Sequence, residues 1–376
     1  MLISNVRYYG ADFRFHYGDI RIEDGCFAEI TGRKGDAPSG CDVLIPGLVD
    51  IHLHGNSGAD FMDGDYDRLT TMARYLAQMG TTSFSAASLT LPEEALSKAF
   101  SNAVKLKQEA PAGCASLRGI TMEGPFFNES KKGAHDPHYL RLPNTAMLKR
   151  LQSMADGLIR IACVAPELQG APDYIHTVRD MGIVCAAAHT NANYDEASAG
   201  FDAGITHVTH LFNAMPPLLH RDPGVIGAAS ERPGVTAELI GDGIHVHPSA
   251  VRAAFKLFGA ESICLISDAM SATGLPEGGP YSLGGLPVTV NDGRATLADG
   301  TIAGSVATLM SCVQRVIGMG IPAEDALRCA TANPARVIGA DDIGVVAVGK
   351  RADFMVLDSD WDIRNVYIAG QRVERA

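Results

Sequence analysis

The sequence predicts a TIM-like (β/α)8 barrel of the α/β class, with a small β-sandwich domain beside it. Three observations support this fold class. Apolar runs with strand character alternate with amphipathic helical patterns, there are eight such runs, and short strands occupy both ends of the 376-residue chain. Eight parallel strands with intervening helices are typical of a closed barrel. An open doubly wound sheet is the alternative, but no Gly-x-Gly-x-x-Gly fingerprint opens a helix.

Both ends of the chain carry short strand-like runs separated by turns. Asp24-Gly25 is a hairpin signal between two such runs within residues 1–42. Residues 345–376 contain two more, at 352–357 and 366–373. Neither end has enough strands to bury one face of a sheet by itself. We therefore expect the two ends to join in one small β domain.

Residues 43–344 are expected to form the barrel. The predicted strands are residues 43–54, 81–89, 116–123, 158–164, 183–189, 206–210, 235–240 and 262–268. The predicted helices are residues 66–79, 92–108, 145–154, 171–181, 194–203 and 248–258. Gly284-Gly285 and Asp292-Gly293 indicate a β-hairpin insertion near residues 275–301. Residues 310–319 and 323–331 then read as closing helices.

Composition excludes several classes of function. The formal net charge is -12, so a broad nucleic-acid-binding surface is not expected. No apolar run approaches the roughly 20 residues that span a membrane. The N-terminus lacks the basic-then-apolar pattern of a signal peptide. The eight cysteines form no Cys-x-x-Cys pair, which argues against a thiolate zinc site. We therefore expect a reduced, cytoplasmic enzyme.

Polar residues gather at the ends of the predicted strands. They are His52 and His54 at the first strand, Glu123 at the third, His189 at the fifth, His210 at the sixth, His245 after the seventh and Asp268 at the eighth. The carboxyl ends of barrel strands meet at one mouth, where active sites lie. Polar groups are costly to bury together unless something joins them, and imidazole and carboxylate are ligands that suit Zn²⁺ or Fe²⁺. The pattern predicts a divalent metal site.

Strand geometry decides between some of these histidines. His52 and His54 are two residues apart, so they point to one side of a strand and can share one metal centre. His207 and His210 are three apart and face opposite ways, and His210 is preferred because it lies nearer the strand end. A lone buried histidine is more often structural than a ligand, and Asp268 alone can be a capping carboxylate. The metal hypothesis therefore depends on the barrel.

Several longer motifs resemble those of a known family. Residues 46–54, Asp268 and residues 349–357 resemble the amidohydrolase superfamily. Within it, the sequence resembles the N-acetylglucosamine-6-phosphate deacetylases, through motifs that run in order along almost the whole chain. These motifs are Met122-Glu123-Gly124-Pro125-Phe126, Lys131-Lys132-Gly133-Ala134-His135, Ala188-His189-Thr190-Asn191-Ala192, Thr209-His210-Leu211-Phe212-Asn213-Ala214-Met215, His220-Arg221-Asp222-Pro223-Gly224, Asp242-Gly243-Ile244-His245 and Ser267-Asp268-Ala269.

The resemblance implies roles for these residues. Glu123, His189 and His210 match the ligands of one essential metal. His52 and His54 match the ligands of a second metal position that some family members lack, with Glu123 bridging the two. Among the catalytic groups, Asp268 matches a proton shuttle, and His135 matches the residue that polarises the acetyl carbonyl. The implied substrate contacts are Ala134, His135, Asn213, Ala214, Arg221, His245, Ile302, Ala303 and Gly304. Arg221 suits phosphate because guanidinium is a forked donor. The matching arginine of the family reaches a neighbouring subunit's site, which implies a homodimer.

The implied activity is hydrolysis of N-acetyl-D-glucosamine 6-phosphate to D-glucosamine 6-phosphate and acetate, in amino-sugar catabolism. The alternatives are deacetylation of N-acetylgalactosamine 6-phosphate or of a non-phosphorylated N-acetyl amino sugar. More distant are a cyclic-amide hydrolase of the same superfamily and a barrel without activity. A barrel without activity is expected to have lost a ligand or the eighth-strand aspartate, and here none is lost. The sequence does not choose between Zn²⁺ and Fe²⁺, because both accept imidazole and carboxylate.

Overall fold

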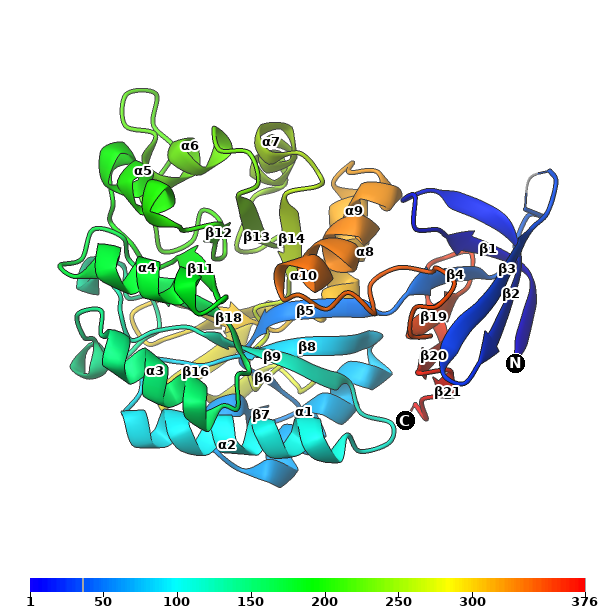
Figure 1. Ribbon diagram of the computed structural model, residues 1–376, viewed down its shortest axis with the longest axis horizontal. Coiled ribbons are helices and arrows are strands. Elements are labelled where there is room, and N and C mark those ends of the chain that lie inside the picture. Colours follow the sequence, from blue (N-terminus) through cyan, green and yellow to red (C-terminus); the bar gives the residue numbers. More distant parts are fainter. Residues whose placement is uncertain (36, 376) are drawn as a thin grey trace.

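A computed structural model describes residues 1–35 and 37–375 and contains the predicted barrel (Figure 1). Eight parallel strands form one sheet in the order β14-β13-β12-β11-β10-β9-β8-β5, which is the order of the chain read backwards. The strands are β5 (Leu48–Leu53), β8 (Thr81–Ala87), β9 (Ser116–Met122), β10 (Ile159–Val164), β11 (Val184–Ala187), β12 (His207–Val208), β13 (Thr236–Ile240) and β14 (Ile263–Ile266). All eight predicted runs contain a strand of this sheet.

Polar contacts join the first and last strands of this near-barrel. The backbone N–H of Asp268, just beyond β14, donates to the carbonyl oxygen of His52 in β5 at 3.0 Å. The Ser267 hydroxyl donates to Oδ2 of the buried Asp50 at 2.5 Å. The contacts bring the end of β5 beside the end of β14, so that Asp50 and Ser267, which are 217 positions apart, lie in contact.

Most helices lie where the sequence predicted them. They are α1 (Tyr66–Gln78), α2 (Glu93–Glu109), α3 (Thr145–Met154), α4 (Ala171–Asp180), α5 (Tyr194–Ala203), α6 (Gly224–Ser230), α7 (Pro248–Phe258), α8 (Leu309–Gly318), α9 (Ala323–Ala330) and α10 (Ala332–Val337). Short 3-10 helices occur at Phe61–Asp63, Glu129–Lys131 and Pro137–Tyr139. The sequence prediction missed α6 and α10. Helix α6 contains two glycines and follows Pro223, and α10 contains Pro334, so neither has a strong helical signal.

The predicted first strand, residues 43–54, divides at Gly47. Residues before it form β4 (Val43–Pro46), which pairs with strands of the small sheet, whereas β5 belongs to the barrel. A Cβ atom at position 47 would lie 2.1 Å from Oγ1 of Thr82, so the close approach requires glycine. Prediction of one strand over residues 43–54 was therefore wrong, because one apolar run serves two sheets.

Strands from both ends of the chain form one mixed seven-stranded sheet, in the order β21-β20-β19-β4-β1-β2-β3. Its other strands are β1 (Leu2–Tyr9), β2 (Phe15–Glu23), β3 (Cys26–Gly32), β19 (Phe354–Leu357), β20 (Ile363–Ile368) and β21 (Gln371–Arg372). The two termini lie at this end of the molecule (Figure 1). Positions 36 and 376 of the predicted small domain lie outside the described residues. The domain limits, 1–42 with 345–376 and 43–344, stay predictions.

Alternate side chains of this small sheet serve two cores. Leu44, Phe354 and Val356 pack in a cluster with Tyr8 and Phe27. Their immediate neighbours, among them Val43, Ile45, Met355 and Leu357, belong instead to the main core of the barrel. This period of two is what a strand buried on both faces produces. The small sheet is therefore attached to the barrel by apolar packing.

The predicted hairpin insertion is a four-stranded antiparallel sheet of β15 (Gly278–Leu283), β16 (Leu286–Asn291), β17 (Arg294–Thr296) and β18 (Ile302–Ser305). Ser305 forms a bridge with Ala269, immediately after Asp268. A two-stranded sheet of β6 (Gly55–Asn56) and β7 (Ala59–Asp60) follows β5. The insertion therefore lies beside the barrel mouth.

Among the described residues, no helix combines the length and apolar character needed to cross a membrane.

Candidate metal and substrate site

The six predicted metal-site and catalytic residues at the strand ends meet at the mouth of the barrel. His52 lies in β5 and His54 just beyond it, while the others follow their strands by one or two residues. The exposed fractions are 0% for His52, 3% for His54, 1% for Glu123, 5% for His189, 5% for His210 and 8% for Asp268. Burial of this many titratable groups together is unfavourable unless their charges are compensated.

Glu123 is the centre of this cluster. Its Oε1 lies 3.1 Å from Nε2 of His189 and 3.1 Å from Nε2 of His210. Its other oxygen, Oε2, lies 3.3 Å from Nε2 of His54 and 3.4 Å from Nε2 of His52. One carboxylate therefore faces two pairs of imidazoles, each with a different oxygen.

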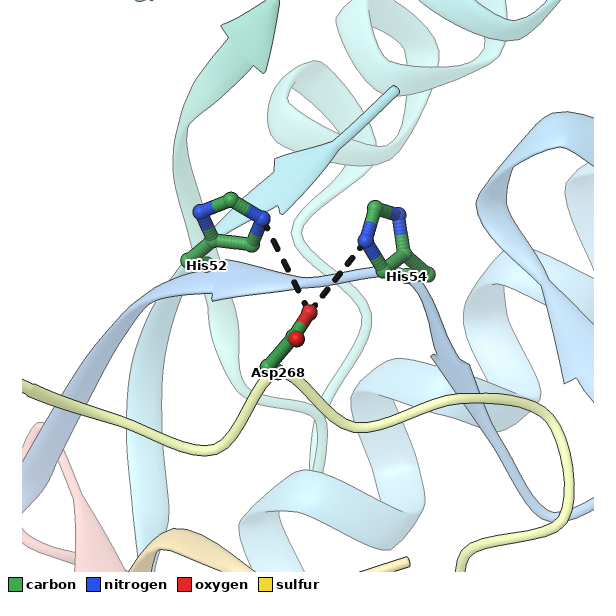
Figure 2. Close-up of side chains that lie close together, drawn as sticks. All are labelled: His52, His54 and Asp268. Carbon is green, nitrogen blue, oxygen red and sulfur yellow. Dashed lines mark ion pairs between the residues drawn. The ribbon is translucent and has the colours of Figure 1, made fainter. Parts of the chain in front are cut away.

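Asp268 faces the pair formed by His52 and His54. Figure 2 shows its carboxylate directed towards both His52 and His54. Its Oδ1 lies 3.8 Å from Nε2 of His52 and 3.3 Å from Nε2 of His54. Two groups of potential ligands result: His52, His54 and Asp268 form one, and Glu123, His189 and His210 form the other. Within each group the ligand atoms lie within 4.8 Å of one another, so each group can hold one divalent metal.

The protonation of these rings follows from their outer hydrogen bonds. Nδ1 contacts a backbone carbonyl in three of them: Lys131 O at 2.7 Å for His189, Asn213 O at 3.2 Å for His210 and Ala87 O at 3.3 Å for His54. A carbonyl oxygen only accepts, so Nδ1 carries the proton. In the neutral ring Nε2 then presents a lone pair, as a metal ligand must.

In the neutral rings, hydrogen-bond acceptors therefore face one another at the centre of the cluster. Burial lowers the pKa of His189 to about 4, so its ring is neutral near pH 7 and its Nε2 lone pair faces a carboxylate oxygen. Nε2 of His189 and Nε2 of His210 lie only 3.2 Å apart. Nε2 of His52 and Oε2 of Glu123 are buried without a hydrogen-bond partner among the described residues. A divalent cation would satisfy all these atoms at once, and the donor set fits Zn²⁺ or Fe²⁺.

Electrostatics beside Asp268 indicate an excess of negative charge. Burial lowers the pKa of His54, but hydrogen bonds and charge from Asp268 and Glu123 outweigh it and raise the pKa to about 10. Without a metal, His54 is therefore protonated at Nε2 near pH 7, and a divalent cation would replace that proton. Burial raises the pKa of Asp268, but His54 and its neighbours outweigh that effect and lower the pKa below its usual value. Asp268 is therefore an ionised carboxylate at neutral pH and can accept a proton.

His135 has the opposite tautomer. Its Nδ1 accepts a hydrogen bond from the backbone N–H of Thr90 at 3.1 Å. The proton of the neutral ring must then lie on Nε2, which is 3.8 Å from Oε2 of Glu123. His135 thus offers an N–H donor beside the cluster, which suits contact with a carbonyl oxygen better than metal ligation.

A cavity of about 540 Å³ opens above the cluster. Of the predicted substrate contacts, those that line it are Ala134, His135, Asn213, Ala214, His245, Ile302 and Gly304. Ala303 is fully buried and packs with the insertion. Arg221 is exposed in the loop before α6 and lies outside this lining. Within one chain, the structure brings together all predicted contacts except these two.

Sequence reasoning missed several polar residues at this mouth. Glu238 of β13 is fully buried and accepts hydrogen bonds from His52 Nδ1 at 2.9 Å and from His207 Nε2 at 3.2 Å. A charged residue inside the apolar run 235–240 was the signal. Asp50 is also fully buried, and burial raises its pKa to about 7. Lys132 also lines the cavity. It lies in the motif Lys131-Lys132-Gly133-Ala134-His135, in which only Ala134 and His135 were predicted to contact the substrate.

A buried mouth on a (β/α)8 barrel that can hold divalent metal suits metal-assisted hydrolysis, and the family comparison agrees. The model of the amidohydrolase family matches residues 43–373. The chain belongs to the amidohydrolase family.

More specific similarity is to sugar-phosphate deacetylases. The N-acetylglucosamine-6-phosphate deacetylase of Bacillus subtilis is 37% identical over 357 residues, covering 92% of this chain and 90% of that protein. The N-acetylgalactosamine-6-phosphate deacetylase of Escherichia coli O157:H7 is 33% identical, covering 94% and 93%. A solved structure of the Mycobacterium smegmatis N-acetyl-D-glucosamine-6-phosphate deacetylase, an aspartate-to-alanine mutant in complex with N-acetyl-D-glucosamine-6-phosphate, has a TM-score of 0.91 and 33% identity, covering 99% of each chain.

Proposed function

We propose that this chain is a metal-dependent hydrolase that converts N-acetyl-D-glucosamine 6-phosphate and water to D-glucosamine 6-phosphate and acetate. The observation that carries the proposal is the meeting of three kinds of group at one cavity. These are the imidazole lone pairs around Glu123, the ionised carboxylate of Asp268 and the N–H donor of His135. Similarity to the Bacillus subtilis deacetylase over 92% of the chain supports the choice of substrate.

Glu123, His189 and His210 would hold the essential divalent metal, and His52 and His54 would hold a second one beside Asp268. When bound there, a divalent metal would supply Lewis-acid activation, lowering the pKa of water from about 16 towards about 7. The outer hydrogen bonds of the histidines keep their Nε2 atoms available for this role.

Asp268 and His135 supply the proton chemistry and the charge stabilisation. Asp268 accepts the proton of the attacking water and then delivers a proton to the amide nitrogen, so that the sugar departs as a neutral amine rather than as an amine anion. Nε2–H of His135 donates to the acetyl carbonyl oxygen as that oxygen gains negative charge. The C–N bond breaks, and the acetyl carbon keeps the oxygen of water.

The phosphate needs local positive charge in a protein of net charge -12. Arg221 is exposed and lies outside the lining of its own cavity, which supports a role in the site of a neighbouring subunit in a homodimer. Lys132 lines the cavity of its own chain and adds a second cation.

Arg221→Ala should raise KM for the 6-phosphate far more than for N-acetylglucosamine. Equal changes in both KM values would remove the phosphate role.

A second candidate substrate is N-acetylgalactosamine 6-phosphate, because the Escherichia coli protein of that name is 33% identical over 94% of this chain. The deciding experiment is a side-by-side assay of acetate release from N-acetylglucosamine, its 6-phosphate and the galacto epimer's 6-phosphate. Each is assayed with Zn²⁺ and with Fe²⁺. A higher kcat/KM for the galacto epimer would overturn the proposed substrate.

The eight free cysteines support the cytoplasmic location proposed from the sequence.

A further inference from the structure

The outer hydrogen bond of His52 differs from those of the other histidines in the cluster. His54, His189 and His210 each donate through Nδ1 to a backbone carbonyl. His52 donates through Nδ1 to the carboxylate of Glu238, at 2.9 Å from Oε2. A carboxylate acceptor forms a stronger hydrogen bond than a carbonyl and raises the basicity of the ligand nitrogen. Nε2 of His52, on the other side of the ring, has no hydrogen-bond partner in residues 1–35 and 37–375.

Glu238 is held firmly enough to impose this tautomer. It is fully buried, as is His52. Its Oε2 also accepts the backbone N–H of His210 at 3.1 Å, and its Oε1 accepts from Nε2 of His207 at 3.2 Å. Three donors converge on one carboxylate, so its side chain has little freedom to turn away from His52.

We propose that Glu238 is a positioning residue that directs the Nε2 lone pair of His52 into the mouth, so that the position formed by His52, His54 and Asp268 binds a second metal. The inference rests on the proposed metal-dependent function. The first position, Glu123 with His189 and His210, has no ring that depends on Glu238. Glu238 contacts only the backbone of His210 there. Loss of Glu238 should therefore weaken one metal position and largely spare the other.

The test is Zn²⁺ binding by Glu238→Gln, measured as metal per chain by elemental analysis and as two dissociation constants in chelator-buffered solutions. The wild-type protein should bind two Zn²⁺. The variant should bind the second roughly 10- to 100-fold more weakly, which is the usual effect of removing an outer partner of a ligand. Loading with Mn²⁺ gives an independent readout, because electron paramagnetic resonance distinguishes a coupled pair of ions from a single ion.

His52→Asn supplies the reference for loss of the second position. If Glu238 acts through His52, Glu238→Gln should have almost no further effect on metal affinity in the His52→Asn background. Asp50→Asn is the matched control. Asp50 is another fully buried carboxylate, and it contacts the backbone N–H of His52 at 3.3 Å but not its ring. It should keep two metals. Glu238→Asp, which keeps the charge but shortens the reach, serves if the glutamine variant does not fold.

Several results would overturn the inference. One is Glu238→Gln with two unchanged dissociation constants. Another is an equal loss of affinity in Glu238→Gln and Asp50→Asn, which would reflect any missing buried carboxylate. A wild-type protein that takes up only one Zn²⁺ at saturation would also overturn it while leaving the proposed function standing, because that function needs one metal. Absence of any bound metal would instead overturn the proposed function.

Discussion

The small sheet and the mouth of the barrel both join residues that are far apart in the sequence, but they bury different chemistry. In the small sheet, Phe27 from the N-terminal part packs against Phe354 from the C-terminal part, with ring centroids 5.8 Å apart. Phe354 also stacks on Tyr367 at 4.5 Å. At the mouth, the buried contacts are polar and include those of Glu123 with four imidazoles.

The two regions also differ in how their buried groups are satisfied. Apolar packing in the small sheet needs no further partner, because it gains free energy by removing apolar surface from water. Within the described part of the chain, the cluster at the mouth leaves the Nε2 atom of His52 and Oε2 of Glu123 without a hydrogen bond, which costs free energy. The comparison indicates that the small sheet contributes stability and the mouth contributes chemistry. Substitutions can break or sharpen that division.

The largest effect on turnover and metal content is expected from Glu123→Gln. The substitution removes the carboxylate charge that belongs to one group of ligands and faces the histidines of the other, so metal should be lost from both. Losing a contribution of several kcal/mol from the metal corresponds to a fall in kcat/KM of roughly 10⁴-fold or more. Elemental analysis and an acetate-release assay measure the two effects. Retention of two metals with near-normal turnover would contradict the central place of Glu123.

Asp268→Asn should have the next largest effect, a decrease in kcat of about 10³-fold, because the amide cannot accept the proton of water. The asparagine fills nearly the same volume, so the thermal unfolding temperature of the metal-loaded enzyme should change little. At least one metal should remain bound at Glu123, His189 and His210. Near-normal turnover would remove the proton-shuttle role.

His135→Ala should decrease kcat by about 10²-fold, because it deletes one donor to the developing oxyanion. Metal content should stay at the wild-type value, since the Nε2 proton of His135 makes it a donor and not a ligand. His138→Ala is the matched control, because that side chain is 85% exposed and contacts Asp136. If His135→Ala lost metal, His135 would have to be reassigned as a ligand.

Much of this division was visible in the sequence, for physical reasons. Barrel strands are buried on both faces, so they appear as continuous apolar runs, and their carboxyl ends must share one mouth. That geometry predicted the meeting of His52, Glu123 and Asp268 from separate strands. The junction at Gly47 was not predictable, because it depends on contact with Thr82 in another strand.

The outer hydrogen bonds were beyond the reach of sequence reasoning. The tautomer of His135 depends on the backbone N–H of Thr90, and that of His52 depends on Glu238 in a strand two places away around the barrel. Neither partner is near in sequence, and neither follows from strand periodicity. Arg221 could be proposed as a phosphate ligand from its chemistry, but its position in a loop left open which cavity it would serve.

The smallest effect on turnover, and the sharpest test of the division, is expected from Phe354→Ala. Phe354 is fully buried in the core of the small sheet, so its removal should lower the free energy of unfolding by about 3–5 kcal/mol. The proposed metal ligands and Asp268 belong to the barrel, so kcat of the folded, metal-loaded variant should stay within about twofold of wild type. Leu2→Ala in the same sheet is the control, since Leu2 is 64% exposed and should alter neither quantity. Chemical denaturation and an acetate-release assay below the unfolding transition measure the two effects. A large fall in kcat at full metal occupancy would mean that the small sheet shapes the mouth as well as stabilising the barrel.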